Sequence, residues 1–256
     1  MGEKVRRARW LLALDHALGR HGLPPRTLGT DLLVPDYTDV LHRGLVEERD
    51  VPGAQVPATA APDAAAAARE PYLAERERVV ASLDLHPLRP PPAVPERLYT
   101  VGRHFWSVWH RGFREVERYR VHHHLRQQVM RRVLDRIGDR TEIVVVAHSL
   151  GGLVALDLLA HLPPGTRVRR LVSIGSPAGW PSLHRGVREQ ATFPYDRIGS
   201  WVDLHSLSDL VPFRRGSVRV YPEAIDVVVP LPVLRHGAEF YLGTPVAGRV
   251  LADALR

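Results

Sequence analysis

One stretch of this chain, residues 141–153 (TEIVVVAHSLGGL), constrains its fold more than any other. A run of β-branched residues at 143–146 is followed by Ala147-His148-Ser149-Leu150-Gly151 and then by a helical pattern. A strand, a tight turn with a serine at its tip and a helix are the parts of a G-x-S-x-G turn. Ala147 replaces the first glycine, which adds only one methyl group where strand and helix approach each other. The stretch therefore predicts a serine hydroxyl held clear of a sheet, with the Leu150 N–H near the first turn of a helix.

The composition excludes several classes of protein. The chain has 256 residues, of which 45% are hydrophobic, enough for one sizeable core with a lid or insertion. It has no cysteine, which excludes disulfides, a thiolate nucleophile and cysteine metal sites. No apolar run approaches the roughly 20 residues of a membrane span, and the apolar patch near the start is too short for a signal peptide. We therefore expect a cytoplasmic protein with no transmembrane segment.

The basic charge does not by itself indicate a nucleic-acid partner. The net charge is +7, and the positive charge is almost entirely arginine, spread along the chain among Ala, Pro, Val and Leu. No nucleic-acid-binding motif accompanies it, so we expect no nucleic acid as partner. A basic protein that binds nucleic acid or a membrane surface is a hypothesis that depends on charge alone.

Strands alternate with helices along the chain, which predicts an α/β fold with a mostly parallel sheet flanked by helices. The expected strands beside the one at 143–146 are 30–37, 169–174, 201–207 and 225–229. The expected helices are 5–21, 72–85, 115–137, 150–162 and 245–255. We expect residues 1–256 to form a single domain.

Residues 51–113 are predicted to form a lid or insertion within that domain. The Ala- and Pro-rich part at 45–69 is typical of a linker that becomes helical from about Asp63. Five prolines between 87 and 95 predict an extended segment. In 97–113, four aromatic residues at helical spacing are typical of core packing as well as of a lid helix.

A serine nucleophile needs a histidine as base and a carboxylate to orient that histidine. The three acid candidates are Asp203, Asp209 and Asp226. The first and third lie within predicted strands, whereas Asp209 follows the strand 201–207 in a loop, where such an acid belongs. We therefore favour Asp209; the alternative is a turn residue that caps its own loop.

Chain order selects His236 as the base, because it is the only histidine after His205. His148 adjoins the serine, but its side chain is expected to point off the turn, into packing or toward a polar rim. The run at 122–124 is three histidines on a predicted helix. Their side chains point about 100° apart and cannot converge on one ion, so we expect neither a metal nor another cofactor.

Four blocks in this order resemble bacterial lipases and serine esterases of the α/β-hydrolase superfamily: AHSLGG at 147–152, LVSIGSP at 171–177, WVDLHSLSDLVP at 201–212 and HGAEFY at 236–241. The resemblance implies Ser149 as nucleophile, Asp209 as acid, His236 as base and the Leu150 N–H as an oxyanion donor. It also implies a small-molecule ester or acyl substrate, and the aromatic residues favour a lipophilic acyl group. The expected activity is that of an esterase that works through an acyl-enzyme.

One expected part of such a protein is missing near the start of the chain. In these hydrolases an early strand ends in a His-Gly loop that supplies the second oxyanion N–H, but here a predicted helix begins at Val5. We expect either a start codon assigned too late or an incomplete oxyanion hole, and one lost donor costs about 10²–10³ in rate. The alternative function is therefore a catalytically impaired hydrolase-fold protein that binds a ligand or partner.

Overall fold

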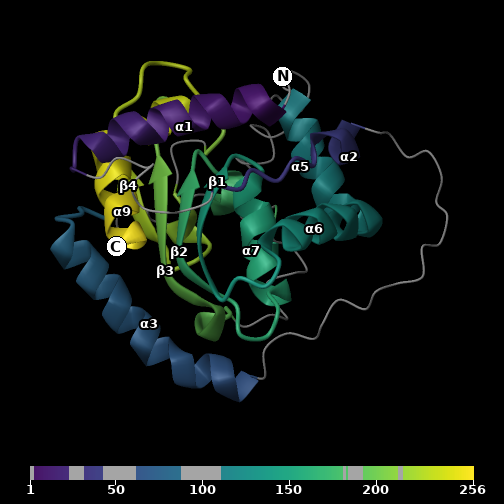
Figure 1. The fold of residues 1–256 in the computed structure, drawn as a ribbon, viewed down its shortest axis with the longest axis horizontal. Helices are drawn as coiled ribbons and strands as arrows, with labels where there is room; N and C mark the ends of the chain where they lie inside the picture. The colour runs from purple at the N-terminus through teal and green to yellow at the C-terminus, as the bar shows by residue number, and fades with distance from the viewer. Residues whose placement is uncertain are drawn as a thin grey trace.

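The computed structural model describes residues 3–22, 32–42, 62–87, 111–180, 183, 193–212 and 216–256. Their centre is a four-stranded sheet in which all strands are parallel and lie in chain order (Figure 1). The strands are β1 (Glu142–His148), β2 (Arg167–Ile174), β3 (Ile198–His205) and β4 (Ile225–Val228). The predicted α/β class with a parallel sheet flanked by helices is confirmed at this level.

Most strand residues are apolar because helices cover both faces of the sheet. Every residue of β3 is buried, and β4 pairs only with its second half, from Val202 to His205. All four carboxyl ends lie at one edge of the sheet, where open α/β folds bind ligands. Among the described residues, β1 has a neighbouring strand on its β2 side only.

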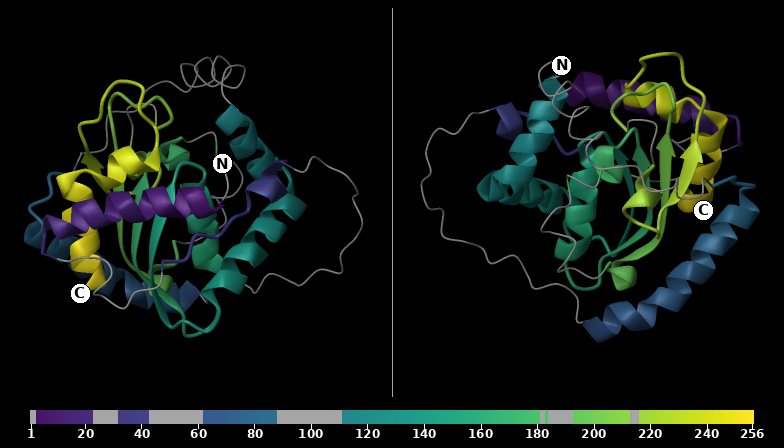
Figure 2. Two further views of the ribbon diagram at one scale, coloured as in Figure 1. Left: turned by 45° about the horizontal axis from the view of Figure 1, so that its top comes forward. Right: turned by 180° about the vertical axis from the view of Figure 1, so that it is seen from behind.

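Two groups of helices pack on the two faces (Figures 1 and 2). On one face, α6 (His123–Ile137) and α7 (Gly151–His161) bury apolar side chains against Leu171 and Trp201. On the other, α1 (Glu3–Gly19), α8 (Ala238–Leu242) and α9 (Pro245–Leu255) pack against Val172 and Leu204. No helix in the described ranges is long and apolar enough to cross a membrane.

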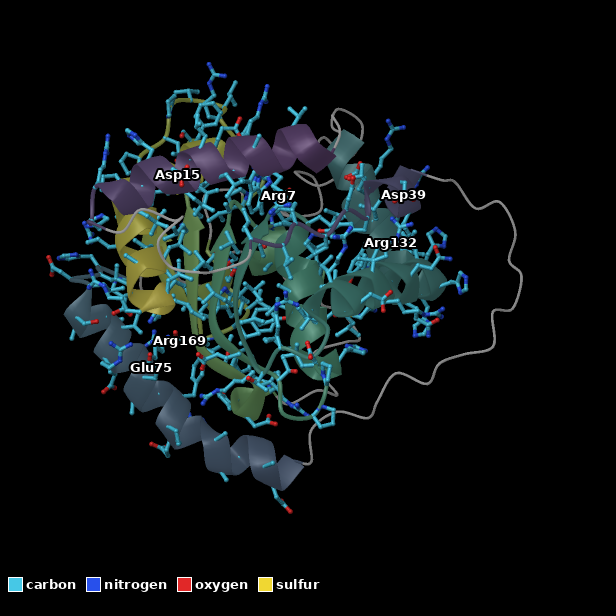
Figure 3. All side chains as sticks on the ribbon, in the orientation of Figure 1. Arg7, Asp15, Asp39, Glu75, Arg132 and Arg169 are labelled. Atoms are coloured by element: carbon cyan, nitrogen blue, oxygen red, sulfur yellow. The ribbon has the colours of Figure 1, made fainter. Side chains whose placement is uncertain are left out.

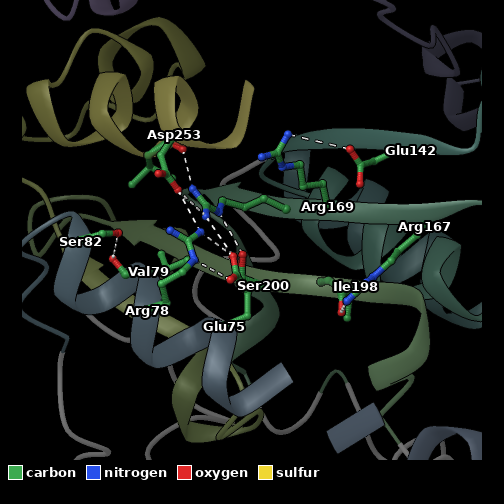
Figure 4. A network of polar contacts seen from close by, with 12 residues as sticks. Glu75, Arg78, Val79, Ser82, Glu142, Arg167, Arg169, Ile198, Ser200 and Asp253 are labelled. Carbon is green, nitrogen blue, oxygen red and sulfur yellow. Dashed lines mark hydrogen bonds and ion pairs between the residues drawn. The ribbon is translucent and has the colours of Figure 1, made fainter. Parts of the chain in front are cut away.

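A buried arginine joins α3 (Pro62–Ser82) to β2 and α9. Arg170 is 2% exposed, and its guanidinium lies 2.8 Å from Asp253 and 3.7 Å from Glu75. It also donates to the Ser200 hydroxyl and to the Val250 carbonyl. Figure 4 shows this network between α3 and α9. The charge of the arginine is thus offset by two carboxylates from different helices.

The predicted strand at 30–37 is wrong for its described part. Residues 32–37 have no regular secondary structure and lead into α2 (Thr38–His42), while 30–31 lie outside the described residues. Pro35 cannot donate to a strand ladder, and the Asp36 carboxylate accepts from the Thr38 N–H, which starts a helix. Asp39 in α2 pairs with Arg132 in α6 at 2.5 Å. Figure 3 labels both residues, which lie close together on their helices.

The single helix predicted at 115–137 is two helices, α5 (Arg111–Val121) and α6, separated at His122. His122 has an extended backbone conformation, and β-branched and histidine residues are poor helix formers. The break lets both helices reach the same carboxylate oxygen. Tyr119 donates to Asp157 at 2.7 Å and Arg126 donates to it at 3.1 Å.

The predicted lid segment, 51–113, is described only in part. Helix α3 begins at Pro62, close to the predicted Asp63, and ends at Ser82 rather than at residue 85. It packs against β3, with Tyr72 fully buried. The proline-rich residues from 88 to 95 and the aromatic residues up to 110 lie outside the described residues. The lid therefore stays a prediction.

Candidate active site

Ser149 stands between β1 and α7 in a conformation that few residues other than glycine adopt. Its φ is +56°, its N–H donates to the Ile174 carbonyl at 3.1 Å, and its own carbonyl accepts from the Gly152 N–H. Such a left-handed residue at the end of a strand marks a strained turn. Leu150 follows as the N-cap of α7, so its N–H belongs to the helix start, where backbone donors have no intrahelical acceptor.

A hydrogen-bonded chain joins the three residues that the sequence selects. The Nε2 atom of His236 lies 2.9 Å from the Ser149 hydroxyl oxygen, and its Nδ1 lies 2.7 Å from an Asp209 carboxylate oxygen. Asp209 lies in the loop after β3 and His236 in the loop before α8. Because a carboxylate only accepts, Nδ1 carries a proton, which leaves Nε2 of the neutral ring as an acceptor for the serine hydroxyl.

Asp209 is held as an anion by three donors. Tyr241 donates its hydroxyl at 2.6 Å to the oxygen that faces His236, and the Val211 N–H donates to the other oxygen at 2.9 Å. Burial by itself raises the pKa of this carboxyl, but the bonds from His236, Tyr241 and Val211 lower that pKa below its ordinary value. Tyr241 was part of a sequence block without an assigned role, since only the fold brings its hydroxyl to Asp209.

Gly175, directly after β2, leaves room for these side chains. Its φ is +56°. A Cβ there would lie 2.9 Å from Tyr241, 3.1 Å from Asp209 and 3.2 Å from His236. The site therefore needs both the left-handed backbone and the missing side chain at this position.

His148 packs on the base and does not replace it. Its ring centroid lies 4.6 Å from that of His236, and its Nε2 donates to the His236 carbonyl at 2.5 Å. Trp10 of α1 contacts it edge-on. Burial, followed by the nearby His236 ring, lowers the pKa of His148 to about 4, so the ring is neutral near pH 7. This agrees with the expectation that His148 has a packing role.

The two acids that the sequence disfavoured lie elsewhere. Asp203 and Asp226 are buried on neighbouring strands, opposite each other in the β3–β4 register. Within the described ranges, their ligand atoms and one of His205 form the only group placed closely enough to hold a metal ion. The sequence analysis missed this group because it considered each acid alone, whereas the register between strands brings them together. The histidine run at 122–124 is not part of it.

No known protein family matches this chain when its sequence is compared with family models, and a search of curated proteins finds no significant relative. The geometry of Ser149, His236 and Asp209 is therefore the main indication of function.

Proposed function

We propose that this protein is a serine hydrolase with an α/β-hydrolase-like fold that cleaves a carboxylic ester through an acyl-enzyme on Ser149. The observation that carries the proposal is the continuous hydrogen-bonded chain from the Ser149 hydroxyl through both nitrogens of His236 to Asp209. A nucleophile on a strained strand-to-helix turn, a base and an orienting carboxylate are what acyl transfer to serine requires.

Each group has one role in the proposed reaction. The Ser149 oxygen attacks the ester carbonyl carbon while His236 Nε2 takes the hydroxyl proton. The negative charge that forms on the carbonyl oxygen is stabilised by the Leu150 N–H at the start of α7. His236 returns the proton to the alcohol as the ester bond breaks. Water, deprotonated by His236, then attacks the acyl carbon, which releases the acid and restores the serine.

Apolar side chains near the base and the acid favour a lipophilic acyl group. Leu207 comes just before the Asp209 loop, and Val233 and Leu234 come just before His236; all three are exposed. The two loops are joined by hydrogen bonds, among them Leu234 N–H to the Ser208 carbonyl. Exposed apolar side chains beside a polar centre suit an apolar substrate better than a charged one. A cytoplasmic location and the absence of a nucleic-acid partner remain part of this proposal.

Turnover of p-nitrophenyl esters of increasing acyl length tests the proposal. We expect hydrolysis by the full chain and at least a 10³-fold loss of kcat in Ser149→Ala and in His236→Ala. Ser82→Ala is the matched control, because Ser82 lies exposed on α3 and its hydroxyl donates to the Val79 carbonyl of the same helix. Equal rates in Ser149→Ala and Ser82→Ala would exclude Ser149 as the nucleophile.

The alternative is a hydrolase-fold protein that binds a ligand or partner without turning it over. It is favoured by one observation: among the described residues β1 has a neighbouring strand on its β2 side only, so the early strand whose loop would supply a second oxyanion N–H is not found there. A well-folded full chain without any esterase activity would favour this alternative.

A further inference from the structure

The sheet buries a second polar group, which the proposed hydrolysis does not use. Asp203 and Asp226 face each other across β3 and β4, and His205 follows on the same face of β3, two residues after Asp203. All three side chains are fully buried. Ser173 of β2 lies opposite Asp203 in the register and extends this polar row across three strands.

The negative charge of this group lacks a full counter-charge. Asp203 accepts hydrogen bonds from the Ser173 hydroxyl and from the Ser217 N–H, and Asp226 accepts one from the Val218 N–H. Neither carboxylate forms an ion pair with an arginine or a lysine within the described residues. Two basic groups are near: the Nδ1 of His205 lies 3.9 Å from Asp203, and the charge of Arg76 on α3 attracts Asp226. Two adjacent buried carboxylates are unfavourable unless a cation or a proton joins them.

Four buried atoms at this place have no hydrogen-bond partner: both ring nitrogens of His205, the Asp226 Oδ1 and the Ser217 hydroxyl. Buried polar atoms in folded proteins are nearly always paired, so a cluster of unpaired ones needs an explanation. One ligand atom from each of Asp203, His205 and Asp226 lies within 4.8 Å of the others. The unpaired histidine is an observation independent of the acidic pair, and it adds a nitrogen ligand to two oxygen ligands.

We propose that Asp203, His205 and Asp226 form a buried binding site for one divalent metal ion of the zinc type. Two carboxylates balance the charge of such an ion, and zinc binds imidazole nitrogen and carboxylate oxygen at about 2.0–2.2 Å, usually with four ligands.

The backbone beside the site is adapted to the carboxylate. A Cβ on Gly216 would lie only 1.7 Å from the Asp226 Oδ2, so the carboxylate occupies the space that any other residue would need. The metal ion would join β3 to β4 just before the loop that carries Asp209. It has a structural role in this proposal, and the proposal does not depend on the esterase activity.

Zinc binding by the chelator-treated full chain tests the proposal. We expect one Zn²⁺ per chain by equilibrium dialysis and elemental analysis, and a rise in Tm of about 5–10 °C when free Zn²⁺ exceeds its Kd by about 100-fold. Asp226→Asn and His205→Gln should abolish both effects. A folded chain that binds no Zn²⁺ would overturn the proposal, because a proton shared by the carboxylates would then explain the cluster.

The three histidines at 122–124 supply the matched control. Their simultaneous replacement by glutamine should leave the stoichiometry and the Tm rise unchanged, and loss of binding in that variant would overturn the proposal. X-ray absorption of the zinc-loaded wild-type chain keeps the test decisive where a cluster variant does not fold. One imidazole with oxygen ligands supports the site, and two or more imidazoles contradict it.

Discussion

At the scale of single residues, the Tyr241 hydroxyl decides how firmly Asp209 is held as an anion. We predict that Tyr241→Phe lowers kcat/KM by about 10-fold, because a hydrogen bond to a buried charged group contributes about 1.5–3 kcal/mol. The phenyl ring keeps the packing, so KM and fold should change little. Ester turnover across substrate concentrations measures the two constants.

Tyr195→Phe is the control for that change. Tyr195 also donates its hydroxyl to a carboxylate, Glu223, at 2.8 Å, but at the opposite end of β3. Tyr195→Phe should leave kcat/KM unaltered. Equal losses in the two variants would show that the effect of Tyr241 is a general loss of stability.

His148 makes stability depend on pH in a predictable direction. Its pKa is about 4 in the folded chain against 6.5 for a free histidine, so the unfolded chain binds more protons between these values. The free energy of unfolding must therefore fall as the pH drops from about 6.5 toward 4. We predict that His148→Gln, which keeps a donor for the His236 carbonyl, removes about 2 kcal/mol of this decrease.

Urea unfolding at several pH values measures the effect of His148. The difference in the free energy of unfolding between the wild-type chain and His148→Gln should become smaller as the pH falls. Two parallel curves between pH 6.5 and 4 would show that His148 is not held neutral by the fold.

At the scale of elements, the turn after β2 places the backbone of Gly175 directly against side chains of the candidate active site. We predict that Gly175→Ala lowers kcat/KM by about 100-fold or more, because the added methyl group displaces Asp209, His236 and Tyr241 by several tenths of an ångström. The left-handed φ also strains an alanine by about 1–2 kcal/mol.

Gly165→Ala separates strain from displacement. Gly165 has a φ of +84° in the turn before β2, and a Cβ there has no neighbour within 4 Å. Gly165→Ala should lower Tm about as much as Gly175→Ala does and leave kcat/KM unchanged. A comparable loss of activity in both variants would mean that strain alone explains Gly175.

Local patterns predict some of these elements and fail for others. Runs rich in β-branched and other apolar residues identify β1 to β4, although buried polar side chains such as Arg170 and Asp203 interrupt them. The strand at 32–37 was wrong because an apolar run resembles a strand even where Pro35 and Asp36 start a helix. The break at His122 has a local signal, since histidine is a poor helix former, but that signal is too weak to place a break within 115–137 from the sequence.

For the candidate site, too, some features follow from the local sequence and others depend on the tertiary structure. Chain order and loop position were enough to select Ser149, Asp209 and His236, and the structure brings them into contact. The Tyr241 hydroxyl, the space at Gly175 and the pairing of Asp203 with Asp226 depend on the register and packing of separate strands. These distances cannot be predicted from the sequence alone.

At the scale of the whole molecule, the Arg170 network joins three elements, β2, α3 and α9, that are far apart in sequence. We predict that Asp253→Asn lowers the free energy of unfolding by about 3 kcal/mol, since it leaves a buried guanidinium with Glu75 as its remaining carboxylate. Chemical unfolding of the purified wild-type and Asp253→Asn chains measures this change in the free energy of unfolding.

The exposed pair of Arg169 and Glu142 is the control, and Figure 4 shows both pairs. Their charged atoms lie 3.9 Å apart near the surface, where an ion pair contributes little. Glu142→Gln should change the free energy of unfolding by less than about 0.5 kcal/mol. An equal effect of the two substitutions would contradict the structural role of Arg170.

The central claim is that Ser149 is an activated nucleophile, and covalent labelling tests it most directly. The full chain is treated with a fluorophosphonate probe and digested, and the modified peptide is located by mass spectrometry. We expect one adduct per chain, on Ser149, which disappears in His236→Ala because the serine loses its base. An adduct on another serine, or none on the folded chain, would contradict it.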